Sequence, residues 1–372
     1  MNNIPDWYHV KDAEQLDSPA LLLYPERIKQ NIALVKTMID DVSRLRPHVK
    51  TSKSPDVIRL MMEAGIKKFK CATIAEAEML ATCHAPDILL AYQLTYPKIL
   101  RFIHLIKTYT RSCFSCLVDN QESAALLSAT AVENDLVIKV YIDLNVGMNR
   151  TGIKPGKEAM SLYEKVLLMS GLKLVGLHAY DGHIREKNFE KRTRICKDAF
   201  SSTEEMRANL KSRGYMLPGL VAGGSPTFAI HAQRENTECS PGTFVFWDKG
   251  YADSIPEQPF VFAALVLARV VSLPDEERIC IDLGYKAVAS ENDLNSRVFF
   301  LNAPGLVPVS HSEEHMVLKA EKAHHFKIGD LLYALPVHIC PTVALYSHAT
   351  CIEDGMVTDT WKITARDRSI GS

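Results

Sequence analysis

The regular alternation of short apolar runs with amphipathic segments is the feature that most constrains how this 372-residue chain can fold. Runs without polar alternation are typical of parallel strands that helices cover on both faces. We predict eight such strands, at Leu45–Lys50, Lys68–Ala72, Asp87–Tyr92, Phe114–Val118, Val137–Asp143, Lys173–His178, Gly219–Ala222 and Thr237–Cys239. Helices are predicted between them, for example at 55–64, 74–82, 120–134 and 157–170.

Eight strands alternating with helices favour an α/β fold, a (β/α)8 TIM-type barrel. An open doubly wound sheet is the alternative, but no G-x-G-x-x-G follows the first strand to mark a dinucleotide site. Ahead of these strands the sequence predicts a further strand at 18–24 and a proline-opened helix at 25–41.

The sequence pattern changes after about Phe244. Short β-rich runs broken by Pro, Gly, Asn and Asp replace the helical periodicity, at Val261–Val271, Arg278–Leu283, Val298–Leu301, Met316–Leu318 and Leu331–Leu335. We therefore expect two domains, a barrel over residues 20–243 and an all-β domain over 244–372 that residues 1–19 join.

Composition favours small-molecule chemistry. The 43 basic and 44 acidic residues give a net charge of −1, so no overall field attracts nucleic acid or an anionic membrane. Nine cysteines, an odd number in apolar or helical contexts, indicate a reducing compartment, and the polar N-terminus lacks the pattern of a signal peptide. We expect a cytoplasmic protein without a membrane span.

The ends of the predicted strands carry most of the residues with reactive side chains. Lys50 closes the first strand, where a barrel enzyme would place a Schiff-base amine, although a solvated surface lysine is the alternative for its position alone. Arg150 lies in a glycine-containing loop after the fifth strand and could bind a phenolate or a carboxylate, or form a surface ion pair. The sixth strand leads into Tyr180 and His183, which suit a ring contact and a general base.

Two loops rich in small residues suit an anion. The loop after the seventh strand and the loop after the eighth strand are where barrels bind phosphate, and each offers backbone N–H groups and hydroxyls. The candidate ligands in these loops are Gly223, Gly224, Ser225, Thr227, Gly242 and Thr243.

Several of these stretches together resemble the alanine-racemase-fold enzymes that use pyridoxal 5'-phosphate (PLP), over nearly the whole chain. The matching stretches are RPHVKT at 46–51, CAT at 71–73 with Glu76-Ala77-Glu78, GMNRTG at 147–152, YDGH at 180–183, GGS at 223–225 and PGT at 241–243. The resemblance is narrower to the metal-activated branch that includes D-serine dehydratase, D-threonine aldolase and D-threo-3-hydroxyaspartate dehydratase. It implies that Lys50 holds PLP, that Arg150 and Tyr180 contact it and that the two loops hold its phosphate.

The most specific part of the resemblance is PVHICPT at 336–342. In that branch the histidine and the residue two positions later bind a divalent metal, which assigns His338 and Cys340 as ligands. Alternate residues of an extended segment point to the same side, as two ligands of one ion require. Cysteine at the second position is typical of the dehydratases, whereas the aldolases tend to have aspartate, and a thiolate favours zinc over manganese or magnesium. Ser52 and Val337 depart from the family pattern, which leaves the surroundings of the ligands and the substrate choice open.

The resemblance implies a lyase that converts β-hydroxy D-amino acids such as D-serine, D-threonine or D-3-hydroxyaspartate into a keto acid and ammonia. Retro-aldol cleavage to glycine and an aldehyde, with His183 as the base, is the alternative from the same parts. A non-catalytic PLP carrier and a simple racemase are further alternatives, but neither needs a metal pair. In relatives of this fold the β domain of one subunit often completes the site of the other, so a homodimer is expected.

Overall fold

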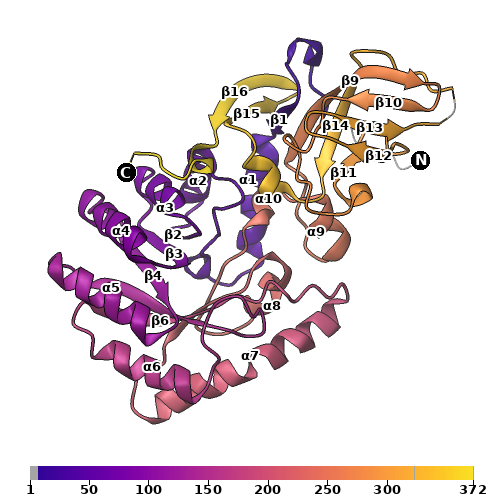
Figure 1. Ribbon diagram of the computed structural model, residues 1–372. Coiled ribbons are helices and arrows are strands. Elements are labelled where there is room, and N and C mark those ends of the chain that lie inside the picture. Colours follow the sequence, from indigo (N-terminus) through magenta and orange to yellow (C-terminus); the bar gives the residue numbers. More distant parts are fainter. Residues whose placement is uncertain (1–6, 322, 372) are drawn as a thin grey trace. The chain divides into compact units, whose positions relative to one another are not determined.

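The computed structural model describes residues 7–321 and 323–371, and its contacts divide the chain into two compact units. Of the described residues, the barrel unit comprises 33–50, 58–242 and 367–371, and the β unit comprises 7–32, 51–57, 243–321 and 323–366. The predicted placement of residues 1–6 in the β domain lies outside the described residues. Each unit has its own sheet, shown in Figure 1.

The barrel unit is built on a parallel sheet in which each strand pairs with the next along the chain. Its strands are β2 (Lys68–Cys71), β3 (Asp87–Gln93), β4 (Cys113–Val118), β5 (Ile138–Leu144), β6 (Leu172–Ala179), β7 (Gly219–Ala222) and β8 (Thr237–Cys239). These strands confirm seven of the eight predicted barrel strands, with ends that differ by at most one residue. Most apolar side chains of these strands are buried on both faces of the sheet, as the uninterrupted apolar runs predict.

The eighth predicted strand, Leu45–Lys50, is an irregular segment that still closes the barrel. Leu45 bridges Cys239 of β8, and His48 bridges Lys70 of β2, both in parallel. Pro47 contributes a carbonyl, which accepts a hydrogen bond from the Lys70 N–H (2.8 Å), but it has no N–H of its own to extend a ladder. The segment therefore carries Lys50 between the first and last strands of the sheet.

Helices connect the strands of the barrel unit, and their first residues explain where they begin. The Thr73 hydroxyl accepts the Glu76 N–H (3.1 Å), while the Glu76 carboxylate accepts the Ala72 N–H (2.7 Å). The helices are α3 (Ile74–Thr82), α4 (Tyr96–Thr108), α5 (Gln121–Glu133), α6 (Lys157–Leu167), α7 (Phe189–Ser212) and α8 (Phe228–His231), together with α1 (Pro25–Thr37) and α2 (Pro55–Glu63), which run from one unit into the other.

The β unit contains a nine-stranded mixed sheet. Its strands are β1 (Ala20–Leu23), β9 (Ala264–Asp275), β10 (Arg278–Ile281), β11 (Val298–Phe300), β12 (Val307–His311), β13 (Met316–Lys319), β14 (Leu331–Pro336), β15 (His348–Glu353) and β16 (Met356–Lys362). The strand β1, which precedes the barrel in sequence, lies between β9 and β15. Two short helices, α9 (Lys249–Ser254) and α10 (Ile339–Val343), follow the barrel and β14.

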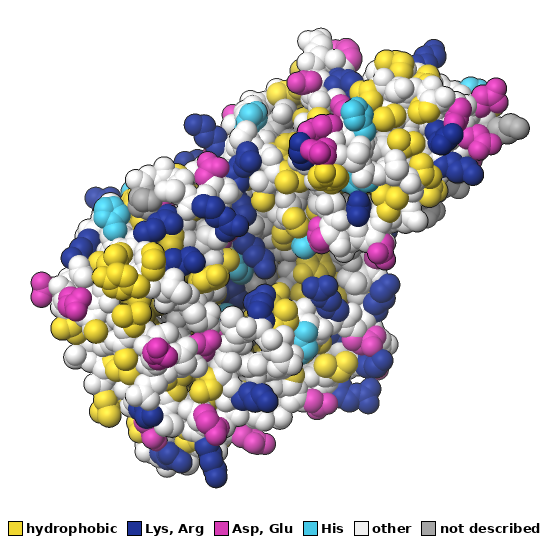
Figure 2. Space-filling model, in the orientation of Figure 1, with side chains coloured by type: hydrophobic (Ala, Val, Ile, Leu, Met, Phe, Trp, Pro, Cys, Tyr) yellow, Lys and Arg dark blue, Asp and Glu magenta, His cyan; other side chains and the backbone are white. Residues whose placement is uncertain are grey.

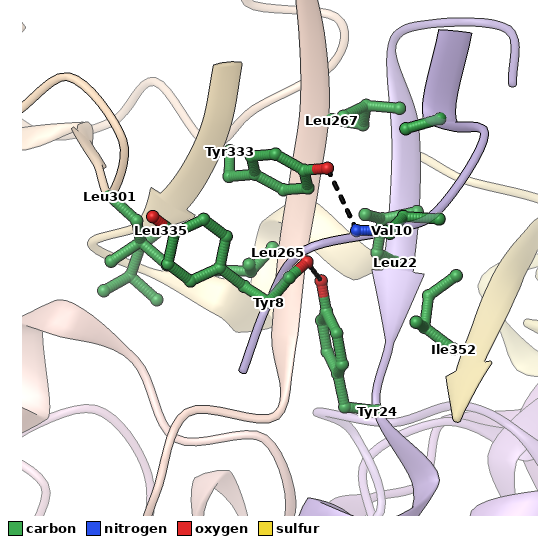
Figure 3. Packing of buried hydrophobic residues seen from close by; sticks show 11 residues of the cluster. Tyr8, Val10, Leu22, Tyr24, Leu265, Leu267, Leu301, Tyr333, Leu335 and Ile352 are labelled. Carbon is green, nitrogen blue, oxygen red and sulfur yellow. Dashed lines mark hydrogen bonds between the residues drawn. The ribbon is translucent and has the colours of Figure 1, made fainter. Parts of the chain in front are cut away.

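A cluster of aromatic and aliphatic side chains fills the core of the β unit (Figure 3). Two tyrosine hydroxyls are satisfied inside it, because Tyr333 accepts the Val10 N–H (3.2 Å) and Tyr24 donates to the Tyr8 carbonyl (2.7 Å). Each fully buried aliphatic or aromatic side chain contributes about 1.5–3 kcal/mol through burial. The N-terminal segment is thus held in this core by packing as well as by backbone pairing.

The surface carries charges of both signs. In Figure 2 basic and acidic side chains both occur across the face drawn, in agreement with the near-zero net charge. Among residues 7–321 and 323–371, no helix combines the length and the apolar character needed to cross a membrane.

Candidate active site

A cavity of about 550 Å³ opens at the carboxyl ends of the barrel strands. This volume is within the range of small-molecule and cofactor sites. Residues from β2 to β6 and from the closing segment line it: His48, Lys50, Lys70, Ala72, Ala91, Tyr92, Gln93, Thr95, Lys98, Leu117, Asp143, Arg150, Thr151, His178 and Tyr180. Four cationic side chains and one carboxylate make the lining positive, which suits an anionic ligand.

Three of the predicted site residues, Lys50, Arg150 and Tyr180, meet in this cavity. The Lys50 Nζ lies 5.8 Å from the centre of the Tyr180 ring, and the Arg150 guanidinium carbon lies 5.1 Å from it. The backbone N–H of half-buried Lys50 donates to His48 Nδ1 (3.2 Å), which helps to fix the end of the closing segment. An amine that the backbone holds at the carboxyl edge of the barrel sheet is the arrangement that a Schiff-base lysine requires.

A second lysine in the cavity, Lys70, was not predicted as a site residue. It is 2% exposed, and its Nζ also lies 5.8 Å from the centre of the Tyr180 ring. Burial and the neighbouring Lys50 charge lower the pKa of Lys70 to about 7. The signal that could have found it is a lysine inside an apolar predicted strand, two residues before the end of that strand.

A hydrogen-bonded chain of polar side chains lies behind Lys70. His178 Nε2 is 3.5 Å from Lys70 Nζ, and His178 Nδ1 is 2.7 Å from an Asp143 oxygen. Gln93 donates to both Asp143 (2.8 Å) and Asp119 (3.0 Å). Burial alone would raise the pKa of Asp143, but hydrogen bonds from His178 and Gln93 hold it below its usual value.

These contacts assign the protonation of His178. An ionised Asp143 requires a proton on His178 Nδ1, which leaves Nε2 as an acceptor that faces Lys70. Burial lowers the pKa of His178, and the positive charges of Lys70 and Arg150 act in the same direction. The imidazole is therefore neutral at neutral pH, and its Nε2 can accept a hydrogen bond from the Lys70 amine.

The two loops predicted to bind phosphate lie side by side in the barrel unit. The Ser240 N–H donates to the Ala222 carbonyl (3.2 Å), and the Gly242 N–H donates to Ser225 Oγ (3.3 Å). Gly223 has a φ of +75°, and a Cβ at this position would lie 2.5 Å from His231 Cδ2, so only glycine fits there. Buried Ser240 Oγ has no hydrogen-bond partner among the described residues. The loops thus fit a phosphate by their glycine backbone and by a spare buried hydroxyl.

The other residues of these loops are used within the protein. Thr227 Oγ1 donates to Asp181 (2.8 Å), and the other oxygen of that carboxylate is 2.8 Å from His231 Nε2. Cys196 lies 3.7 Å from Asp181 and 3.6 Å from His231, so these three side chains could hold a metal ion by geometry. However, burial raises the pKa of the Cys196 thiol to about 12, and both carboxylate oxygens have partners. We interpret this group as a buried network that supports the Gly223 turn.

The structure does not bring His183 to the cavity wall. Its side chain is exposed and lies against the loop after β5, where a Cβ on Gly147 would be 2.8 Å from His183 Nε2. Among the described residues that line the cavity, the titratable nitrogen bases are His48, Lys50, Lys70, Lys98 and His178 instead. Gly147 itself has a φ of +115°, which favours glycine, and so the loop can approach the imidazole closely.

The predicted metal ligands lie in the β unit, but the extended geometry expected for them is wrong. The strand β14 ends at Pro336, His338 is the N-cap of α10, and Cys340 lies within the first turn of that helix. The Thr342 hydroxyl donates to the His338 carbonyl (2.9 Å), which helps to turn the chain into a helix. Pro341, at an early helical position, is compatible with this start because its missing N–H would have no partner there.

His338 and Cys340 nevertheless remain close to one another. Burial alone would lower the pKa of His338, but a hydrogen bond to Cys340 and the carboxylate of Glu291, which pairs with His338 Nδ1, raise it to about 9. Cys340 Sγ lies 3.0 Å from Thr51 Oγ1 and 3.7 Å from Thr243 Oγ1. An imidazole, a thiol and a carboxylate form a donor set that zinc accepts, so these residues fit the implied ion. Thr243, predicted as a phosphate ligand, belongs with this pair in the β unit.

Comparison with known proteins gives a consistent result. Residues 24–249 match the model of the alanine racemase N-terminal domain, and residues 263–352 match a serine dehydratase domain. The chain is 26% identical to D-threonine aldolase from Arthrobacter sp, over 95% of this chain and 93% of that one, and 27% identical to D-threo-3-hydroxyaspartate dehydratase from Delftia sp. HT23, over 93% and 97%. The crystal structure of D-threonine aldolase from Filomicrobium marinum superposes with a TM-score of 0.86, at 26% identity over 95% of this chain and 96% of that one. The protein belongs to the alanine racemase N-terminal domain family.

Proposed function

We propose that this protein is a PLP- and metal-dependent lyase that acts on β-hydroxy D-amino acids, with Lys50 as the lysine that binds the cofactor. The observation that carries the proposal is the half-buried amine of Lys50 in a positive cavity at the strand ends, beside Arg150 and Tyr180. Relatives along nearly the full length of the chain are named as aldolases and dehydratases of such amino acids, which supports the same class of reaction.

The residues of the barrel unit divide into those that hold the cofactor and those that move protons. We assign Gly223, Gly224, Ser225 and Gly242 to the phosphate, with Ser240 as an additional hydroxyl donor. Arg150 and Tyr180 lie where they can contact the cofactor ring. Thr227 supports this site through Asp181, and its hydroxyl is not required as a phosphate ligand. These roles rest on the contacts within the unit and on the family resemblance.

When bound, PLP stabilises negative charge at the α-carbon of an attached amino acid. With its amine free, Lys50 would be able to remove the α-proton of the substrate. A ligand that fills the cavity excludes water, which strengthens the contacts of Lys50 and Arg150 with negative groups. These side chains therefore supply proton transfer and orientation.

We assign His338 and Cys340 to a divalent metal, with zinc favoured because a thiolate is a soft ligand. Such an ion would make the β-hydroxyl of the substrate a better leaving group by Lewis-acid polarisation. Glu291 orients His338 from its Nδ1 side, as carboxylates commonly orient metal-binding histidines. The half-buried Val337 places this pair through backbone hydrogen bonds with Arg297 (2.9 Å) and Gly250 (3.1 Å).

Between the two lyase reactions, Cys340 favours dehydration to a keto acid and ammonia. Retro-aldol cleavage to glycine and an aldehyde remains the second candidate, because the relatives include enzymes of both kinds at similar identity. A PLP carrier or a racemase would leave His338 and Cys340 without a purpose. The odd number of cysteines, in apolar or helical contexts, favours a reducing compartment, and a homodimer is expected from the fold's relatives.

The experiment that tests this proposal is incubation of the purified protein with D-serine, D-threonine and D-3-hydroxyaspartate, with and without a chelator. Keto acid, ammonia and aldehyde are assayed separately, and the L-enantiomers serve as controls. Keto acid and ammonia from a D-substrate, lost on chelation and restored by zinc, is the expected result. Aldehyde without keto acid would replace dehydration by aldol cleavage, and turnover unaffected by chelation would exclude the metal role.

A further inference from the structure

Three lysines line the cavity, Lys50, Lys70 and Lys98, and only Lys50 has a role in the proposed function. Lys70 is 2% exposed, lines the same cavity and lies at the same distance from the Tyr180 ring as Lys50 does, 5.8 Å. An ammonium group has three N–H donors. Among the described residues, the one acceptor that lies near the Lys70 amine is His178 Nε2, at 3.5 Å. Most of the hydrogen-bonding capacity of this buried group is therefore available to a ligand in the cavity.

Lys70 is held rigidly next to the segment that carries Lys50. Its N–H donates to the Pro47 carbonyl (2.8 Å), and its carbonyl accepts the Val49 N–H (2.9 Å). The two lysines thus extend from paired backbone segments into one cavity. A catalytic group must be positioned this precisely, and a lysine on a strand is better fixed than one on a loop.

A purely structural lysine would be paired with a carboxylate, because a buried unpaired charge is costly. The two carboxylates whose charges act on Lys70 already have partners. Asp143 accepts from His178 and Gln93, and Asp181 accepts from Thr227 and lies against His231. The titratable and charged groups around the Lys70 amine are Arg46, Lys50, Asp143, His178, Tyr180 and Asp181. None of these carboxylates is within hydrogen-bond distance of Lys70 among the described residues.

We propose that Lys70 is a second catalytic residue of this site, which exchanges a proton with the β-hydroxyl of the substrate while Lys50 removes the α-proton. This inference rests on the proposed function and adds a group that exchanges protons with the substrate hydroxyl, the role that the sequence pattern predicts for His183 in retro-aldol cleavage. In dehydration, the Cβ–O bond breaks with its electron pair on oxygen, which takes a proton from the Lys70 ammonium and leaves as water. The neutral Lys70 then regains a proton from solvent.

The surroundings of Lys70 suit this role. Burial and the Lys50 charge hold the pKa of Lys70 near 7, so that both protonation states are populated at neutral pH. A proton-transfer group works best when its pKa is close to the working pH. Neutral His178, fixed by Asp143, accepts from Lys70 and so orients the amine without competing for its charge. His178 and Asp143 are positioning residues in this scheme.

Two substitutions separate proton transfer from charge and packing. Lys70→Met keeps the length of the side chain and removes the amine, whereas Lys70→Arg keeps a positive donor that does not titrate near neutral pH. Both variants are expected to lower kcat by about 10²–10⁴-fold with KM changed only a few-fold. In Lys70→Ala, small alkylamines added to the solution are expected to restore part of kcat. Lys98→Met, which removes another lysine of the cavity, is the matched control and should not respond to the amines.

A second measurement does not depend on activity. In protein labelled with ¹³C at the lysine Cε, one signal should titrate near pH 7, disappear in Lys70→Met and persist in Lys98→Met. A Lys70 signal that titrates near the ordinary lysine value of about 10.4 would overturn the assignment. Full kcat in Lys70→Arg would overturn it as well, because arginine can bind an anion but cannot exchange this proton. If the wild-type protein turns over no β-hydroxy D-amino acid, the proposed function fails. If the wild-type protein turns over such a substrate and Lys70→Arg is equally active, only the role of Lys70 fails.

Discussion

Arg46 is a fully buried charge on the segment that closes the barrel, four residues before Lys50, and we predict that Arg46→Met destabilises the barrel unit. Its Nε lies 2.6 Å from Glu238 on β8, and its Nη1 lies 2.6 Å from Asp87 on β3. Burial alone would lower the pKa of Arg46, but the two carboxylates raise it above its usual value, so the guanidinium remains charged. Through this side chain the irregular closing segment is thus attached both to β8 and to β3.

The size of the effect follows from these two contacts. A hydrogen bond to a charged group contributes about 1.5–3 kcal/mol, so two of them give about 3–6 kcal/mol. Asp87 and Glu238 are 33% and 21% exposed at the side chain and regain some hydration when Arg46 is absent, which places the loss near the lower value. We expect the free energy of unfolding to fall by about 3 kcal/mol.

Urea denaturation of the wild type and of Arg46→Met measures this loss directly. The matched control is Arg213→Met, which removes an arginine from an exposed pair with Glu164 and should cost less than about 1 kcal/mol. Because the closing segment carries Lys50, the fraction of protein that retains bound PLP should fall in Arg46→Met as well. A loss no larger than that of Arg213→Met would refute the idea that Arg46 holds the closing segment in place.

Three further changes test other parts of the site. Gly223→Ala, whose Cβ would lie 2.5 Å from His231, should weaken phosphate binding at least about tenfold in calorimetry and lower the free energy of unfolding by more than about 1 kcal/mol. The control Gly219→Ala, which has open space around the new Cβ, should change neither quantity. The free energy of unfolding of the wild type should rise from pH 7 to 10, because Lys70 has a pKa of about 7 in the folded protein and binds more protons in the unfolded chain. Urea midpoints that rise equally in Lys70→Met would contradict this. Cys340→Ala should lose its metal in elemental analysis and keep the visible absorbance of PLP; unchanged metal content would exclude Cys340 as a ligand.

Much of the fold could be predicted because local patterns and tertiary structure agree in it. The apolar runs of the barrel strands are buried from both sides, so seven of them appear in the structure nearly as predicted. The closing segment differs because Pro47 cannot donate to a ladder, and the barrel closes there through single bridges and the buried charge of Arg46. The edge strands β12 and β16 were not predicted, because residues such as Val307 and Met356 are exposed and give no clear pattern.

Site residues could be predicted where their position at the end of a predicted strand identifies them. They were predicted less well where the direction of the side chain decides whether it reaches the cavity. Lys50, Arg150 and Tyr180 share the cavity because the carboxyl ends of parallel strands converge. His183 lies only three residues after Tyr180, yet its side chain is exposed against Gly147. A sequence pattern does not encode this difference, since the turn that separates the two side chains depends on neighbouring loops.

Chemical context limits the prediction of the remaining residues. Nothing in the sequence around Lys70 shows that its amine would be buried beside another lysine, because that proximity comes from the pairing of β2 with the closing segment. The expectation of an extended segment at His338 and Cys340 was wrong because Thr342 and Pro341 favour a helix start there. The proximity of the two side chains was predicted, but through the wrong backbone geometry.

The most direct test of the account is to identify the lysine that binds PLP. Borohydride reduction of the PLP-loaded protein, followed by proteolysis and mass spectrometry, fixes the cofactor on its lysine and locates it. We predict that the modified peptide carries the cofactor on Lys50, and that Lys50→Ala abolishes the modification while Lys53→Ala retains it. Modification of Lys70 or Lys53 in place of Lys50 would contradict the assignment of the cavity lysines and the proposed function built on it.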